Sequence, residues 1–238
     1  METPAADETI VMTATFNPGS TPFLVVRDEQ ERIFQYLCSL AAWARPSRVR
    51  RLVLGENSNT TFDFSPVIRL FEAAGKELEL IVFDGNQEAS RVGKGYGEGR
   101  ILERVFRNST LLRSTPSFYK ITGRLFVSNF DDVSQSTPTA DGFRRKRWKD
   151  PARPPKVITR FFKCSKELFE RRLLDAYLEA DDSRGRHIEH IYFDRLAEID
   201  VPDFGVKPAL VGQQASTGEV YGAYDDEIVR VARSLLSA

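Results

Sequence analysis

The sequence predicts an α/β fold in which helices cover both faces of a mostly parallel central sheet. Short apolar segments rich in β-forming residues alternate with longer segments whose apolar residues recur at helical spacing. Turn-forming residues separate the two kinds of segment, as at Asn17-Pro18-Gly19. This alternation is typical of parallel sheets with crossover helices, which form three layers.

The expected elements of the first half follow this alternation from the amino terminus. Asp28 can cap the first helix, and Gly75 is a suitable residue to end the second one. The expected elements are strand 9–15, helix 28–44, strand 51–54, helix 66–74, strand 78–83, helix 98–108 and a strand within 117–129. Ligands of such sheets bind beyond the carboxyl ends of the strands, so the polar clusters at 16–20, 55–60 and 84–98 should meet at one rim.

The second half is organised differently and begins with a polar stretch. Residues 131–155 lack periodicity, which at that length predicts a mobile functional loop or an insertion. The elements expected after it are strand 156–163, helix 165–180, helix 187–198, a short strand at 208–211 and a terminal helix from 225. We expect this half to pack on the sheet as a smaller lobe and to form one wall of a cleft, within a single domain over residues 1–238.

Composition indicates a soluble globular protein without a strong electrostatic field. Lysine plus arginine and aspartate plus glutamate both number 34, so nothing attracts nucleic acid or acidic lipid to the chain as a whole. Cys38 and Cys164 lack a CxxC neighbour and should be buried thiols of a reducing compartment. We find no signal peptide and no run of about 18 apolar residues. A cytoplasmic location is therefore expected, which leaves peripheral attachment to a membrane open.

The segment 117–129 carries two cations among its apolar residues. Lys120 and Arg124 are four residues apart, so an unbroken strand would point both side chains to one face. Buried cations need partners, which are either acidic residues of the protein or an anionic ligand at the end of the strand. Gly123 lies between them and lets a backbone or a ligand approach closely.

A glycine-rich segment, GKGYGEG at 93–99, directly precedes the expected helix at 98–108. Small residues allow backbone N–H groups, such as those of Gly95 and Gly97, to face a phosphate or a ribose. The start of a helix also favours negative charge, and Lys94 adds a cation. The segment matches neither a Walker loop nor a dinucleotide motif, and a plain flexible loop is the alternative.

Carboxylates and histidines form two further candidate groups. Glu189, in the HIEH segment at the start of a helix, is a candidate general base. The chain's two histidines, His187 and His190, flank it and can also bind one metal ion, whereas a polar helix N-terminus is the structural alternative. The adjacent Asp131 and Asp132 suit Mg²⁺ or Mn²⁺, although a solvated turn explains them as well.

Other polar residues admit both functional and structural interpretations. Glu56, Asn57 and Asp84 follow the second and third strands and can hydrogen-bond a nucleobase and a ribose, although turns favour the same residue types. The basic run RRKRWK at 144–149 is similar in composition to a nucleic-acid or phosphate patch. Because the chain has no net positive charge, a solvated loop or a flap over an anionic substrate is the better interpretation.

Together, these segments resemble a bacterial family of polysaccharide or lipopolysaccharide glycosyltransferases with a GT-A-like, nucleotide-diphosphosugar transferase fold. The resemblance covers most of the chain, and its motifs are TATFNP (13–18), the R-x-x-x-Y helix ending in Trp43, LGENS (54–58), GKGYGEG (93–99), FYKITGR (118–124) and GRHIEHIYF (185–193). It implies a nucleotide-binding half at 1–130 and an acceptor-side half at 156–238. It also implies a nucleotide-sugar donor and a saccharide or glycolipid acceptor, joined by an inverting transfer.

The resemblance further implies roles for individual residues. GT-A enzymes usually hold the donor diphosphate with an Asp-x-Asp and a divalent metal, but this chain has KITGR at 120–124. Fixed cations are therefore expected to replace the metal, without a required cofactor; Asp131 and Asp132 are the fallback ligands for Mg²⁺ or Mn²⁺. Glu189 would deprotonate the acceptor, and His190 would orient Glu189 or contact the donor. The expected donor-binding residues are Thr15, Asn17, Glu56, Asn57, Asp84, Lys94, Gly95, Gly97, Lys120, Thr122, Gly123 and Arg124.

Two other classes of function stay open at this point. A sugar nucleotidyltransferase normally has a glycine-rich loop directly after its first strand, where this chain has FNPGST. A non-catalytic module would bind nucleotide or nucleic acid through the basic run. The expected glycosyltransferase has no nucleic-acid partner and works in the cytoplasm, at the inner face of the membrane if it is attached there.

Overall fold

The computed structural model describes residues 7–21, 24–150, 152–214 and 217–237. Its centre is a five-stranded sheet in the order β3-β2-β1-β4-β8. The strands are β3 (Glu77–Val82), β2 (Val49–Glu56), β1 (Glu8–Ala14), β4 (Ser117–Thr122) and β8 (Phe161–Ser165). The first four are parallel and β8 is antiparallel to β4. The mostly parallel sheet predicted from the alternation is confirmed.

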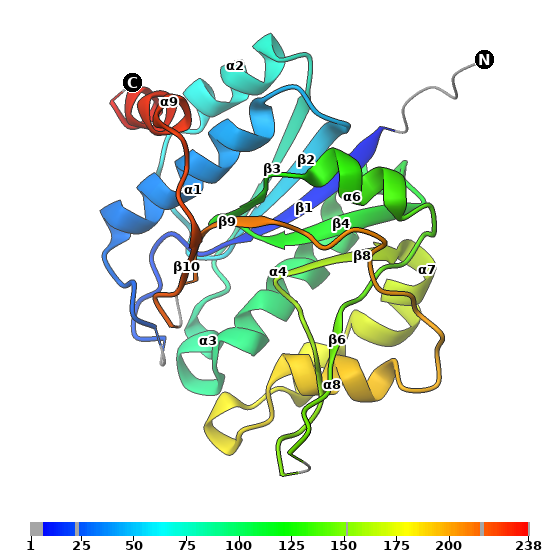
Figure 1. Ribbon diagram of the computed structural model, residues 1–238. Coiled ribbons are helices and arrows are strands. Elements are labelled where there is room, and N and C mark those ends of the chain that lie inside the picture. Colours follow the sequence, from blue (N-terminus) through cyan, green and yellow to red (C-terminus); the bar gives the residue numbers. More distant parts are fainter. Residues whose placement is uncertain (1–6, 22–23, 151, 215–216, 238) are drawn as a thin grey trace, which may run out of the picture.

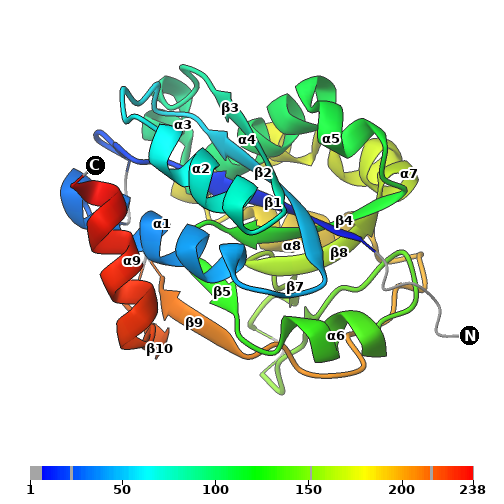
Figure 2. The same ribbon diagram turned by 90° about the horizontal axis from the view of Figure 1, so that it is seen from above.

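Helices cover both faces of the sheet, so the domain has three layers (Figure 1 and Figure 2). One layer holds α1 (Glu29–Ala44), α2 (Ser65–Ala73) and α9 (Asp226–Leu236); the other holds α3 (Gln87–Val92), α4 (Lys94–Asn108), α5 (Thr110–Arg113) and α8 (Ile188–Arg195). β1 shows the reason for this arrangement. Ile10 and Met12 belong to the core beneath α1, and Val11 belongs to the core beneath α4, because successive strand residues point to opposite faces.

The predicted single strand within 117–129 is wrong, because the chain breaks at Gly123. β4 ends at Thr122, and β5 (Leu125–Val127) joins β9 (Leu210–Gln213) and β10 (Val220–Gly222) in a separate sheet. The N–H of Gly123 donates to the carbonyl oxygen of Thr13 at 2.9 Å. A Cβ on Gly123 would lie 2.7 Å from that oxygen, so the chain can cross the end of β1 here only as glycine.

The break separates the two cations of this segment. Lys120 contacts Glu98 of α4, whereas the Arg124 guanidinium lies over the ring of Tyr36 of α1, 5.8 Å from its centre. These helices cover opposite faces of the sheet. The expectation that Lys120 and Arg124 share one face is therefore wrong.

The second half contains more irregular structure than its periodicity predicts. The stretch expected to be a loop, 131–155, contains most of α6 (Phe130–Ser136) and the short strand β6 (Arg145–Lys146), which pairs with β7 (Lys156–Val157) in a hairpin. The expected helix over 165–180 is α7 (Lys166–Leu168), the π turn η1 (Phe169–Leu173) and the 3-10 turn η2 (Ala176–Glu179), followed by η3 (Asp182–Arg184). The N–H of Leu174 donates to the carbonyl of Phe169, five residues back, which interrupts the α-helical pattern.

Both cysteines are buried free thiols, as expected. Burial raises the pKa of Cys38 to about 11. None of the helices formed by the described residues is long and apolar enough to cross a lipid bilayer.

The glycine-rich segment forms the first two turns of α4 and is not a loop before a helix. Gly93, with a φ of 129°, separates α3 from α4. Gly97 leaves room for α3, Gly95 for α8 and Gly99 for η2. The absence of side chains at these three positions lets all three elements pack closely on α4, and that packing offsets the low helix propensity of glycine.

We expect Gly99→Ala to lower the free energy of unfolding by about 1–3 kcal/mol, because its Cβ would overlap the Cβ of Tyr177. Gly95→Ala is the matched control: its Cβ would lie 3.2 Å from Ile188, and alanine favours the helix by about 1 kcal/mol. Urea denaturation of both variants tests this packing. Equal losses of stability would contradict it.

Candidate functional site

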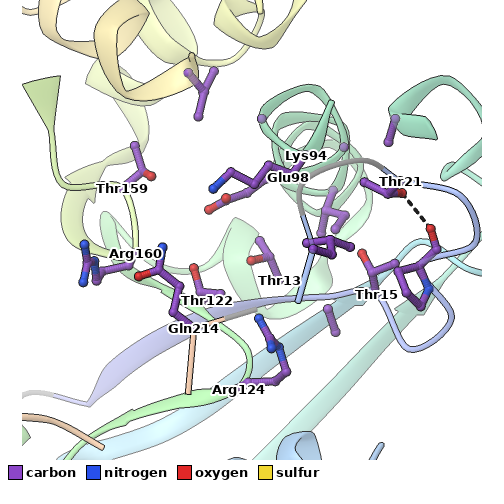
Figure 3. Close-up of a pocket in the computed structure, with 18 of the residues that line it drawn as sticks. Thr13, Thr15, Thr21, Lys94, Glu98, Thr122, Arg124, Thr159, Arg160 and Gln214 are labelled. Atoms are coloured by element: carbon purple, nitrogen blue, oxygen red, sulfur yellow. Dashed lines mark hydrogen bonds between the residues drawn. The ribbon is translucent and has the colours of Figure 1, made fainter. Parts of the chain in front are cut away.

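A pocket opens at the carboxyl ends of β1 and β4 (Figure 3). The chain leaves β1 for α1 on one face of the sheet and enters β4 after α4 and α5 on the other. This is the switch point of the sheet, where ligands of such folds bind. The pocket encloses about 1050 Å³, including solvent at its mouth. Its walls come from β1, α1, α4, α8 and the segments 122–125 and 156–160.

Positive charge dominates this pocket. Five cationic side chains line it, and none of them forms an ion pair within the described part of the chain. Two carboxylates, those of Glu98 and Glu189, also line it. The cations are Arg32, Lys94, Arg124, Lys156 and Arg160.

Arg124 is a buried cation with few polar partners. Its side chain lines the pocket although the residue is only 4% exposed. One nitrogen donates weakly to Gln35 at 3.4 Å, and Nε has no hydrogen-bond partner among the described residues. Burial lowers the pKa of Arg124. A buried cation without a counter-ion costs several kcal/mol, so this position favours the binding of an anion.

Lys94 and Arg160 approach the same space from other sides (Figure 3). Lys94 extends from the first turn of α4 and makes no hydrogen bond or ion pair with any described residue. The Arg160 guanidinium stacks 4.9 Å from the ring centre of Tyr221 and contacts its hydroxyl. Arg160 is therefore held in place, while Lys94 is free to move toward a ligand.

Arg32 shapes the pocket through its own hydrogen bonds. It donates to the backbone carbonyls of Thr15, Phe16 and Val26, so the segment after β1 is fixed to α1. Tyr36 adds to this by accepting a hydrogen bond from the N–H of Thr15 at 3.0 Å. These neutral partners satisfy Arg32 without cancelling its charge.

Lys120 does not line the pocket and is fully buried beneath it. Its ammonium contacts the Glu98 carboxylate and donates to the carbonyl of Thr159 at 2.7 Å and to Thr122 Oγ1 at 3.2 Å. Burial lowers the pKa of Lys120 to about 7, and the charge of Glu189 acts in the opposite direction. Lys120 thus positions Glu98 and presents no surface to an anion, contrary to the expected phosphate contact.

The start of α8 contributes Glu189 to the pocket but not His190. Glu189 is half-buried and makes no hydrogen bond within the described chain. His190 lies outside the lining, and burial, aided by the charge of His187, lowers its pKa. His187 instead contacts Asp182, at 2.8 Å.

The Asp182 carboxylate lies at the start of α4, the position at which a phosphate was expected to bind. Its carboxylate accepts a hydrogen bond from the N–H of Gly95 at 3.4 Å, and the N–H of Gly97 donates within the helix to Gly93. The expected backbone cradle for a phosphate is therefore wrong. Gly95 and Gly97 line the pocket only as small residues.

The segments after β1, β2 and β3 meet at one rim, as expected, but most of their polar groups bind one another. The Glu56 carboxylate accepts hydrogen bonds from backbone N–H groups of residues 16 and 58, and Thr15 donates to Asn57 at 2.6 Å. Of the expected donor-binding residues, Asn17, Glu56, Asn57, Asp84, Lys120 and Gly123 do not line the pocket. Those that line it are Thr15, Lys94, Gly95, Gly97, Thr122 and Arg124.

The fallback metal ligands lie at the opposite edge of the sheet. Asp131, in the first turn of α6, accepts a hydrogen bond from the N–H of Arg48, just before β2 begins. Asp132 is exposed beside it. No cluster of three or more histidine, cysteine, aspartate or glutamate residues suited to a metal occurs within the described ranges. Asp131 and Asp132 are therefore too far from the pocket to serve a ligand bound there.

Four charged lining residues were not predicted from the sequence: Arg32, Glu98, Lys156 and Arg160. Glu98 lies four residues after Lys94, a spacing that places both on one face of a helix, but the segment was expected to be a loop. Lys156 and Arg160 belong to a segment expected to be a plain strand. Nothing local in that segment indicates a pocket.

Comparison with known proteins identifies the fold. No protein-family model matches the sequence, and no curated protein matches it. The apo form of the glycosyltransferase GlyE of Streptococcus pneumoniae is similar in structure, with a TM-score of 0.53 and 10% identity over 84% of this chain. This chain covers 45% of GlyE, less than half of its length. A Bacillus anthracis protein assigned as a glucose-1-phosphate thymidylyltransferase gives a TM-score of 0.51 and 11% identity, covering 97% of this chain and 95% of that one.

Both similarities extend over most of this chain. At such low sequence identity they establish the fold and nothing finer. The chain has the GT-A-like α/β fold found in glycosyltransferases and nucleotidyltransferases.

Proposed function

We propose that this protein transfers a sugar from a nucleotide-activated donor to a saccharide or glycolipid acceptor in bacterial surface-glycan synthesis. The observation that supports this most strongly is the group of five cations at the carboxyl ends of β1 and β4, which form no ion pair within the part of the chain that the structure describes. A diphosphate carries the compact negative charge that such a group of cations binds well. The fold shared with the glycosyltransferase GlyE supports the same class of reaction.

In the proposed reaction, an acceptor hydroxyl attacks the anomeric carbon of the donor sugar. Glu189 takes the hydroxyl proton. The bond from the anomeric carbon to the diphosphate breaks, and its electron pair leaves on the nucleoside diphosphate. Arg124, Lys94 and Arg160 stabilise that negative charge. Attack opposite the leaving group inverts the configuration, and Glu98, held by Lys120, is placed to accept a hydrogen bond from a sugar hydroxyl.

The lining cations also support a reaction that needs no divalent metal. A metal in this position would stabilise the leaving diphosphate, which fixed arginine and lysine side chains also do. Glu98 and Glu189 are the only carboxylates among the described lining residues, and Lys120 already engages the first of them. We therefore assign the role of the metal to the cations.

Sugar nucleotidyltransfer is the second candidate function. The Bacillus anthracis structure favours this function, because the similarity covers 97% of this chain and 95% of that one. The two reactions release different products: a nucleotidyltransferase forms pyrophosphate from a nucleoside triphosphate and a sugar phosphate, whereas a glycosyltransferase releases a nucleoside diphosphate. A non-catalytic module would form neither product and would bind oligonucleotides with a steep dependence on salt.

We expect Arg124→Met to weaken the binding of nucleoside diphosphates at least tenfold while leaving the unliganded protein equally stable or more stable. The reason is that methionine removes an uncompensated buried charge. Thermal-shift titration measures both quantities. Arg32→Met is the control, and it should lose about 2–4 kcal/mol of stability because three backbone carbonyls lose a donor. Unchanged nucleotide affinity in Arg124→Met would remove that residue from the site.

We expect Glu189→Gln to lower kcat by roughly 10²–10⁴-fold, the usual contribution of a general base. Nucleotide affinity should stay near the wild-type value, since glutamine keeps the shape of the side chain. The exposed Glu198 near the end of α8 provides the control, Glu198→Gln. Steady-state release of nucleoside diphosphate is the measurement. Full turnover in Glu189→Gln would exclude Glu189 as the base.

We expect stabilisation by a nucleotide sugar to survive EDTA, because the phosphate ligands are side-chain cations. The shift in melting temperature should be equal with and without the chelator. Loss of the shift in EDTA, with recovery on adding Mg²⁺ or Mn²⁺, would show that the cations do not replace a metal.

A further inference from the structure

The β6–β7 hairpin carries a dense group of cations, most of them exposed, that the proposed chemistry does not use. Between residues 144 and 153 the chain has six cationic residues and one acidic residue. None of the six forms an ion pair with another described residue. We call this group the hairpin patch; its members are Arg144, Arg145, Lys146, Arg147, Lys149 and Arg153.

Aromatic rings and backbone carbonyls hold several of these cations in place. The charged groups of Lys146 and Arg153 stack on the ring of Trp148, 3.9 Å and 4.1 Å from its centre. Arg145 donates to the carbonyls of Leu196 and Ile199 at 2.6 Å and 2.8 Å, just after α8. The hairpin patch is therefore fastened to the helix that carries Glu189.

The hairpin patch is continuous with the pocket. Lys146 of β6 is paired directly with Lys156 of β7, so both side chains lie on the same face of the hairpin. Lys156 lines the pocket. Like charges placed directly opposite each other destabilise a strand pair, and an anionic ligand that spans both lysines would remove that repulsion.

We propose that the hairpin patch binds an acidic polysaccharide and guides it toward the pocket. Spaced, pre-positioned cations suit a chain that carries one carboxylate every few ångströms.

Two other kinds of partner, a membrane and a nucleic acid, fit the hairpin patch less well. A membrane-binding surface also needs exposed apolar side chains, and the large exposed apolar residues of the described chain all lie outside 144–153. A nucleic-acid surface needs a free aromatic face, and two cations already stack on the ring of Trp148. This proposal rests on the proposed function only in treating the polysaccharide as the acceptor.

Binding of fluorescent polygalacturonate oligomers to the full chain tests the proposal, with neutral dextran as the reference glycan. We expect polygalacturonate to bind, dextran not to bind, and the affinity to fall at least tenfold as salt rises from about 50 to about 250 mM. Arg144→Glu with Lys149→Glu should lose at least tenfold in affinity, since both residues are exposed and lie outside the pocket lining. The matched control is Arg230→Glu with Arg233→Glu, since both arginines are exposed on α9, far from the hairpin (Figure 1). This control should bind like the wild type.

Further measurements on the same proteins separate the outcomes. Both double variants should keep wild-type melting temperatures and the wild-type thermal shift with nucleoside diphosphate. Absent or equal binding of both glycans, or equal losses in the two double variants, would overturn the proposal while leaving the nucleotide site intact. Stronger binding to phosphatidylglycerol vesicles or to single-stranded DNA than to polygalacturonate would also overturn it. If the wild-type protein itself does not bind nucleoside diphosphate, the proposed function is overturned instead.

Discussion

The buried charge of Arg124, which has no counter-ion among the described residues, is the constraint on which the rest of the pocket depends. The break at Gly123 creates it. If β4 continued, Arg124 would point to the face that carries Glu98. Instead the chain crosses the end of β1, and the guanidinium meets α1, where Tyr36 and Gln35 offer only neutral groups. The unsatisfied charge faces the pocket. It destabilises the unliganded protein, and a bound anion would offset that cost.

Of the other charged side chains near the pocket, some stabilise the fold and others remain available to a ligand. Lys120 is neutralised from within by Glu98, and Arg32 is satisfied by backbone carbonyls that fix the segment after β1. Lys94 and Arg160 form no ion pair with any acidic residue in the described ranges. Gly95 of α4, where a Cβ would lie 3.2 Å from Ile188, leaves room for α8, the helix that brings Glu189 to the same space.

The sequence predicted the order of the elements and the edge of the sheet at which the pocket lies, because periodicity and turn chemistry are local signals. It did not predict features that depend on distant residues. The break at Gly123 is set by the carbonyl of Thr13, more than one hundred positions earlier. Glycines at 93–99 read as a loop, and only packing against residues such as Tyr177 makes them helical. Arg160 joins the pocket because β8 runs antiparallel beside β4, which no local pattern specifies.

Isothermal titration of the wild-type protein with nucleoside diphosphates and with the corresponding free nucleosides tests the central claim most directly. The two ligands differ only in the diphosphate, so the difference in binding free energy reports what the unpaired cations contribute. We expect at least one diphosphate to bind a hundredfold or more tighter than its nucleoside, a difference of about 2.7 kcal/mol. Equal affinities across all the pairs would contradict the claim that this pocket is built around an anion.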